Sequence, residues 1–83
     1  MPLYLDVHKN VEGLTAAKAT FAHKQDLAVQ GNYGVRYLKY WFDSASGKVF
    51  CLVEAPTADA AMAVHRDAHG MMPDEIFEVE EGS

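Results

Sequence analysis

The chain has 83 residues, which is enough for one domain and leaves no room for a second. Its hydrophobic fraction of 49% supports a packed core and argues against disorder. Seven basic against twelve acidic residues give a net charge of −5. This balance excludes the positive surface of a nucleic-acid binder and disfavours docking on anionic lipid.

A single cysteine, Cys51, rules out an internal disulfide and is typical of a reducing cytosol. The N-terminal residues contain no basic region followed by an apolar run, so we expect no signal peptide. No apolar stretch approaches the roughly 20 residues of a membrane span. We therefore expect a cytoplasmic protein with no membrane partner.

The first two elements follow from periodicity and capping. Residues 3–8 alternate apolar and polar side chains, which predicts a half-buried strand. Its apolar face carries Leu3, Leu5 and Val7. Thr15 then caps a helix that runs to about residue 30, where glycines end it. The polar face of the strand carries Tyr4, Asp6 and His8.

The second half of the chain predicts a hairpin, a helix and a last strand. Residues 35–42 and 48–54 are rich in β-formers and flank a turn in which Gly47 can adopt positive φ. Thr57 caps the second helix, which Gly70 ends. Residues 76–79 form a short final strand.

The order β-α-β-β-α-β predicts an α+β ferredoxin-like sandwich over residues 1–83, with two helices on one face of a four-stranded antiparallel sheet. The other face would be uncovered, and a monomer rarely leaves a large apolar patch wet. We therefore expect a homodimer. We expect the open face to carry Tyr4, Asp6, His8, Phe50, Leu52 and Glu54, and the helix-facing side to carry Val49, Cys51 and Val53.

The second helix ends with two histidines, His65 and His69, at positions i and i+4. Side chains at this spacing share one helical face, so both imidazoles can reach one divalent ion. Imidazole suits nickel, copper and zinc. The motif lacks the glutamate of HExxH and names no third ligand, so a pair of structural histidines remains an alternative.

The chain resembles a family of small bacterial ferredoxin-like proteins, formerly known only as a domain of unknown function, that includes a dimeric nickel-binding member. Five segments carry the resemblance, and they recur in order along nearly the whole chain. They are residues 4–8, residues 22–30 (with Ala22-His23, Asp26-Leu27 and Gln30), residues 34–38 with Trp41, residues 49–56 and residues 64–70. The resemblance implies a homodimer that binds Ni²⁺ near its surface, for sequestration or detoxification, without an established enzymatic reaction.

Five residues are the candidate metal ligands. His65 and His69 are the first candidates. His23 is the third, because we expect the first helix to approach the edge where the second helix ends. Its spacing to Asp26 permits a hydrogen bond that fixes its tautomer. We expect His8 at the opposite end of the subunit from His69, where it and Asp6 can chelate a surface ion. Cys51 is interpreted as a core residue, because a buried free cysteine usually behaves as a small hydrophobe.

Two other functions remain open. The chain can be a small enzyme in which His65 and either Asp6 or His23 form an acid–base pair. It can also be an interaction module whose histidines are structural. A closed cavity lined by His and Asp would favour the enzyme, whereas histidines displayed on an open surface would favour metal binding.

Overall fold

Strands and helices alternate along the chain in the order that the sequence predicts. The computed structural model describes residues 1–83. The strands are β1 (Leu3–His8), β2 (Arg36–Asp43), β3 (Lys48–Glu54) and β4 (Glu75–Val79). The helices are α1 (Ala16–Val29) and α2 (Ala58–Ala68), with a short 3-10 helix, η1 (Gln30–Tyr33), after α1.

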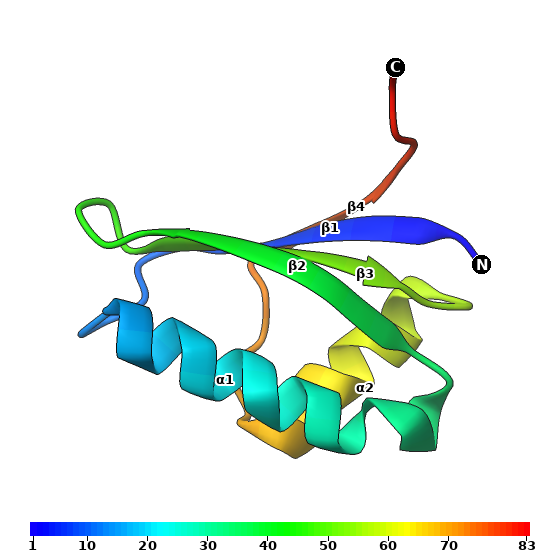
Figure 1. Cartoon of the computed structure of the whole chain (residues 1–83), viewed down its shortest axis with the longest axis horizontal. Helices are drawn as coiled ribbons and strands as arrows, with labels where there is room; N and C mark the ends of the chain where they lie inside the picture. Colours follow the sequence, from blue (N-terminus) through cyan, green and yellow to red (C-terminus); the bar gives the residue numbers. More distant parts are fainter.

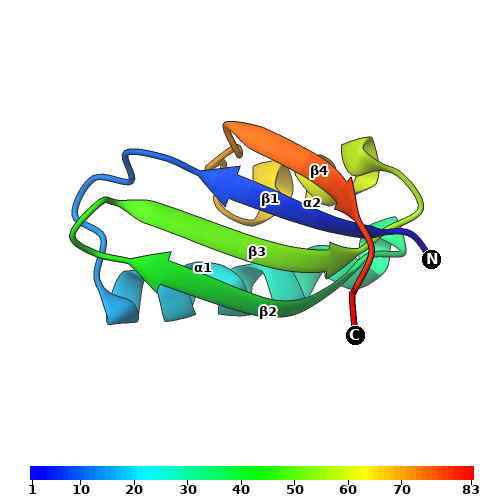
Figure 2. The same cartoon turned by 90° about the horizontal axis from the view of Figure 1, so that it is seen from above.

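The four strands form one antiparallel sheet in the order β2-β3-β1-β4, which confirms the ferredoxin-like α+β fold. Both helices pack on the same face of the sheet (Figure 1), and the view from above shows the other face uncovered (Figure 2). Since α2 returns from the end of β3, it runs in the same direction as β1. The C-terminal end of α2 therefore lies beside the C-terminal end of β1, and this placement builds the site described below.

Both helices begin at the threonines that the sequence predicts. The hydroxyl of Thr15 accepts a hydrogen bond from Lys18 N, and that of Thr57 accepts one from Ala60 N, each at 3.1 Å. Each bond satisfies a backbone N–H that has no partner within the helix. The start of each helix, and so the position of the side chains that follow, is fixed locally.

The hydrophobic core lies between the sheet and the helices. Its fully buried members include Val53, Ala55, Ala61 and Val64, which come from β3, α2 and the loop between them. Tyr37 joins this core from β2 with its hydroxyl directed at the polar centre. The small apolar core therefore packs directly against the buried polar side chains at the centre of the molecule.

The predicted orientation of β1 is wrong. Tyr4, Asp6 and His8 are buried at 9%, 0% and 7% exposure and face the helices, not the open side of the sheet. The polar side chains of Asp6 and His8 lie within this layer because α2 supplies them with partners. Paired polar groups offset the cost of leaving water, so a polar strand face can be buried.

The open face of the sheet is correspondingly apolar. Leu5 lies opposite Leu52 on one side and Phe77 on the other, and Trp41 lies opposite Phe50. Trp41 and Phe77 remain 50% and 48% exposed. The uncovered face is therefore an apolar surface with two exposed aromatic side chains. Neither helix of the fold has the length and apolar character needed to cross a membrane.

Candidate metal centre

His65 lies at the centre of a buried polar cluster between α2, α1 and β1. Its side chain is 1% exposed, and both ring nitrogens contact carboxylates. Nδ1 lies 2.9 Å from Oδ1 of Asp26, and Nε2 lies 2.9 Å from Oδ2 of Asp6. An imidazole that donates from both nitrogens is a protonated one, so the ring is an imidazolium held between two carboxylates.

Asp26 joins the two histidines of α2 to α1. Its Oδ1 also lies 3.0 Å from Nε2 of His69. Nδ1 of His69 accepts a hydrogen bond from the backbone N–H of Met71 at 3.1 Å, which assigns the proton of a neutral ring to Nε2. Asp26 therefore accepts from both members of the His pair, although it is 39 residues from His65 in the sequence.

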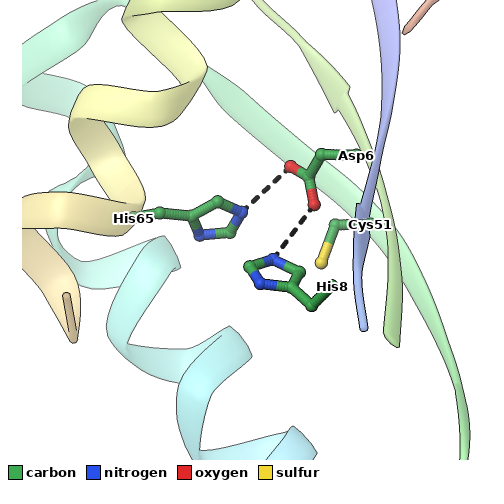
Figure 3. A group of neighbouring side chains, drawn as sticks. All are labelled: Asp6, His8, Cys51 and His65. Carbon is green, nitrogen blue, oxygen red and sulfur yellow. Dashed lines mark hydrogen bonds and ion pairs between the residues drawn. The ribbon is translucent and has the colours of Figure 1, made fainter. Parts of the chain in front are cut away.

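Asp6 has a second set of contacts on the strand side. The hydroxyl of Tyr37 donates to the backbone carbonyl of Ala61 at 3.0 Å and approaches Oδ2 of Asp6 at 3.3 Å. Nε2 of His8 lies 3.2 Å from Oδ1 of Asp6, an ion-pair contact without hydrogen-bond geometry. Oδ1 of this fully buried carboxylate is thus left without a hydrogen-bond partner. Figure 3 shows the rings of His65 and His8 directed at different oxygens of this carboxylate.

The pKa values reflect this arrangement. Burial by itself lowers the pKa of His65, but its hydrogen bonds to Asp26 and Asp6 outweigh burial and raise the pKa to about 9. Burial raises the pKa of Asp6, yet the contacts with His65 and His8 hold it at about 2. The pKa of Asp26 is also lowered, because bonds from His65 and His69 outweigh its burial. Two carboxylates thus face one imidazolium, and the excess negative charge favours a cation.

All four histidines of the chain line one small cavity. Its volume is ≈ 30 Å³, about that of one water molecule. Asp26, Lys18 and seven apolar residues, among them Ala19 and Ala22, form the rest of its wall. An open depression of ≈ 240 Å³ over residues 8–12 and 71–74 shares His8 with the cavity and connects it to the surface. A cavity of ≈ 30 Å³ is too small for an organic substrate.

His23 takes a different position from the one expected. Its ring lies 4.6 Å from that of Tyr40, centre to centre, and its buried Nδ1 has no hydrogen-bond partner. The expected bond to Asp26 is not formed at this nitrogen, because Asp26 is engaged by α2. Burial lowers the pKa of His23, opposed by the charge of Asp26. His23 thus presents a wall of the cavity and does not join the hydrogen-bonded cluster.

The five predicted ligands lie close together in the structure, but the positions of Asp6 and His8 differ from the prediction. His8 does not lie at the far end of the subunit from His69. Both line the same cavity, and the ring of His8 is 4.9 Å from that of His65. The reason is the direction of α2, whose last turn ends beside the end of β1. Asp6 and His8 are therefore buried and do not form a surface chelate.

Two groups of donor atoms have spacings that suit a metal ion. One consists of Asp26, His65 and His69, and the other of Asp6, His8, Cys51 and His65; within each group the donor atoms lie within 4.8 Å of one another. From the sequence, Asp26 is identified as a neighbour of His23 and as part of the family resemblance, but not as a metal ligand. A signal for it exists, because Ala19, Ala22 and Asp26 repeat at helical spacing and place a carboxylate on the inward face of α1. Cys51 is a core residue as predicted, but it also belongs to the second group.

Comparisons with known proteins identify the family and the fold. The crystal structure of SCO4226 from Streptomyces coelicolor A3(2) superimposes with a TM-score of 0.91 at 40% sequence identity, covering 98% of this chain and 99% of that one. A search of curated proteins gives no match. The family model described as "Nickel responsive protein SCO4226-like" matches residues 4–79. The chain therefore belongs to the SCO4226-like family of nickel responsive proteins.

Proposed function

We propose that this protein binds Ni²⁺ as a cargo ion through Asp26, His65 and His69, and acts in nickel sequestration. The observation that carries the proposal is the shared position of Oδ1 of Asp26, 2.9 Å from one imidazole nitrogen and 3.0 Å from another. With metal–ligand bonds of about 2.1 Å, neighbouring ligands of an octahedral ion lie about 3.0 Å apart. Two of the three donor–donor distances therefore match those around an octahedral ion, and the two imidazole nitrogens lie within 4.8 Å of each other.

The surroundings supply what such an ion requires. If Nδ1 of His65 is the ligand, Nε2–H keeps its hydrogen bond to Asp6, which orients the ring and raises its basicity. Nickel takes four to six ligands, and His23 and His8 line the same cavity as further donors or as partners of bound water. The excess carboxylate charge compensates the ion.

A titration of tag-free protein with Ni²⁺ in a calorimeter tests this proposal. Wild type is expected to show one saturable event per chain that Asp26→Asn and His69→Ala abolish. Asp67→Asn is the matched control, because Asp67 lies between the two histidines in sequence yet accepts a hydrogen bond from Tyr33 at the surface. Saturable binding that is unchanged in Asp26→Asn and His69→Ala would contradict the proposed ligands.

We also propose that the protein is a cytoplasmic homodimer that buries the open face of the sheet. The support is the row of apolar residues on that face, with Trp41 and Phe77 about half exposed. Sedimentation analysis should give twice the chain mass for wild type and a shift toward the monomer for Trp41→Glu. Phe21→Glu is a matched control, since Phe21 is also exposed but lies on α1. A wild-type monomer at micromolar concentration would contradict the dimer.

A small enzyme is the second candidate, and one observation favours it. The His/Asp cluster is closed and not displayed on an open surface, and His65 with its two carboxylates resembles an acid–base group. Against this, a cavity of ≈ 30 Å³ has no room for an organic substrate. A thermal-shift screen of small organic acids on metal-free protein separates the two. Stabilisation that depends on His65 would favour the enzyme.

A further inference from the structure

The strand side of the cluster contains a second donor set, which shares only His65 with the proposed nickel site. Asp6 lies directly opposite Cys51 in the β1–β3 pairing, and His8 lies two residues further along β1. All three side chains therefore point from the sheet toward α2, where His65 faces them (Figure 3). The sulfur, the two imidazole nitrogens and the carboxylate oxygen lie within 4.8 Å of one another, and all four residues are buried.

An unpartnered atom points to a cation at this position. Oδ1 of Asp6 has no hydrogen-bond partner although the residue is 0% exposed. A buried anionic oxygen without a partner is costly, and a bound cation would remove that cost. The nearest candidate group, Nε2 of His8, lies 3.2 Å away without hydrogen-bond alignment. An ion that binds both atoms would replace this contact with two metal–ligand bonds.

We propose that Asp6, His8, Cys51 and His65 form a tetrahedral site for Zn²⁺ or a chemically similar ion, distinct from the nickel site. One thiolate, two imidazoles and one carboxylate are the donor types that zinc takes in closed four-coordinate sites. In such a site the donor atoms are about 3.3–3.8 Å apart, given bonds of 2.0–2.3 Å. His65 and His8 already contact the Asp6 carboxylate, at 2.9 Å on Oδ2 and at 3.2 Å on Oδ1. Since all donor atoms lie within 4.8 Å of one another, side-chain adjustments of about 1 Å would bring them to tetrahedral spacing.

The hydrogen bonds around the four donors suit this role. When Nε2 of His65 binds the ion, its Nδ1–H donates to Asp26, the arrangement in which a carboxylate orients a metal-bound histidine. The Tyr37 hydroxyl, which donates to the carbonyl of Ala61, also lies 3.3 Å from Oδ2 of Asp6 and so packs against this ligand. On binding, the thiol proton of Cys51 and the Nε2 proton of His65 pass to solvent, and the ion takes their place.

The two sites share His65 through opposite ring nitrogens. Nickel on Nδ1 requires Nε2–H to face Asp6, whereas zinc on Nε2 requires Nδ1–H to face Asp26. A neutral imidazole carries a single proton, so one ring satisfies one arrangement at a time. Occupancy of the cysteine-containing site therefore excludes nickel from His65. The proposal of the cysteine-containing site does not depend on the proposed nickel site.

Cobalt(II) is the probe that tests the proposal, because it replaces Zn²⁺ and reports its ligands by absorption. Reduced, tag-free wild type should develop, at one equivalent, a near-ultraviolet sulfur-to-cobalt charge-transfer band and the intense visible bands of four-coordinate cobalt. Added Zn²⁺ should abolish both. Cys51→Ser should lose the charge-transfer band, and His8→Gln should lose four-coordinate binding even if the serine variant folds poorly.

Two further variants separate this site from the nickel site. His69→Ala should keep the charge-transfer band, because His69 is not a ligand here. Asp26→Asn should keep the band with affinity roughly 10- to 100-fold weaker, as expected for loss of an outer hydrogen-bond partner. Cobalt binding without a charge-transfer band, a band that survives in Cys51→Ser, or no cobalt binding at all would overturn the proposal. A failure of nickel binding with the cobalt band intact would overturn only the nickel assignment.

Discussion

Replacing His65 by glutamine tests the central ion cluster most directly. The pKa of His65 is about 9 in the folded chain against an ordinary value of 6.5. Since a tenfold change in an equilibrium constant is about 1.4 kcal/mol, the cluster contributes about 3 kcal/mol through this group. His65→Gln leaves two buried carboxylates without their cation, and breaking such a pair costs about 3–5 kcal/mol.

The sign of the pH dependence follows from the raised pKa. The contribution of His65 is complete below about pH 6.5 and is lost as the pH rises through about 9. Between about pH 7 and 8.5 the free energy of unfolding of wild type should fall by about 2 kcal/mol. Burial raises the pKa of Cys51 above its ordinary value of 9.0, so this thiol also lowers the free energy of unfolding as the pH rises past 9. Measurements that stop at pH 8.5 keep this contribution small.

Urea unfolding with chelator present, at several pH values in this range, measures the effect. His65→Gln should flatten the slope, and Asp26→Asn, which keeps Asp6 beside the ring, should reduce it. His23→Gln is the matched control, since it removes a histidine of the same cavity that lies between no carboxylates. A wild-type slope that is flat, or one that His65→Gln leaves unchanged, would refute the assignment of His65 as a buried imidazolium.

Three further predictions concern other parts of the structure. Tyr37→Phe removes the hydroxyl that donates to the carbonyl of Ala61 and approaches Asp6. This variant should lower the free energy of unfolding in urea by about 1–3 kcal/mol and change the Ni²⁺ affinity little. Gly47→Ala places a Cβ on a residue with positive φ (+72°), 3.2 Å from Val11 N. The midpoint of thermal unfolding should fall by the equivalent of about 1–2 kcal/mol. An unchanged midpoint would contradict this strain. The pKa of Asp6 is held at about 2, below its ordinary 3.8, so its contribution of about 2 kcal/mol is complete above pH 3.8 and is lost as the pH falls through 2. Acid unfolding followed by circular dichroism should show this loss in wild type and less of it in Asp6→Asn.

Sequence patterns predict the elements of this fold well because the signals are local. The threonines at positions 15 and 57 cap helices through bonds to residues three positions later. Gly47 takes the left-handed conformation that the hairpin requires. From such elements, the β-α-β-β-α-β order leads to the sheet topology.

The orientation of β1 could not be read in the same way. The prediction assigned Asp6 and His8 to solvent because isolated polar side chains favour water. Their actual partner, His65, is 59 residues from Asp6 in sequence, and no local pattern encodes that bond. Asp26 was missed for the same reason, since its partners lie on the other helix. Contacts between residues far apart in the sequence therefore determine both the orientation of β1 and the position of Asp26 in the cluster.

The presence of this cluster in so small a domain is itself an argument for function. An 83-residue chain has little core to spare, and a buried ion cluster of this kind is often no more stabilising than apolar side chains of similar volume. Here Asp6, Asp26 and His65 occupy the centre of the molecule, beside a cavity of ≈ 30 Å³ that apolar packing would have filled. Stability alone does not account for this cluster of carboxylates and imidazoles. The proposed cation binding does, because the donors, their outer hydrogen bonds and the surplus negative charge would all favour a bound ion.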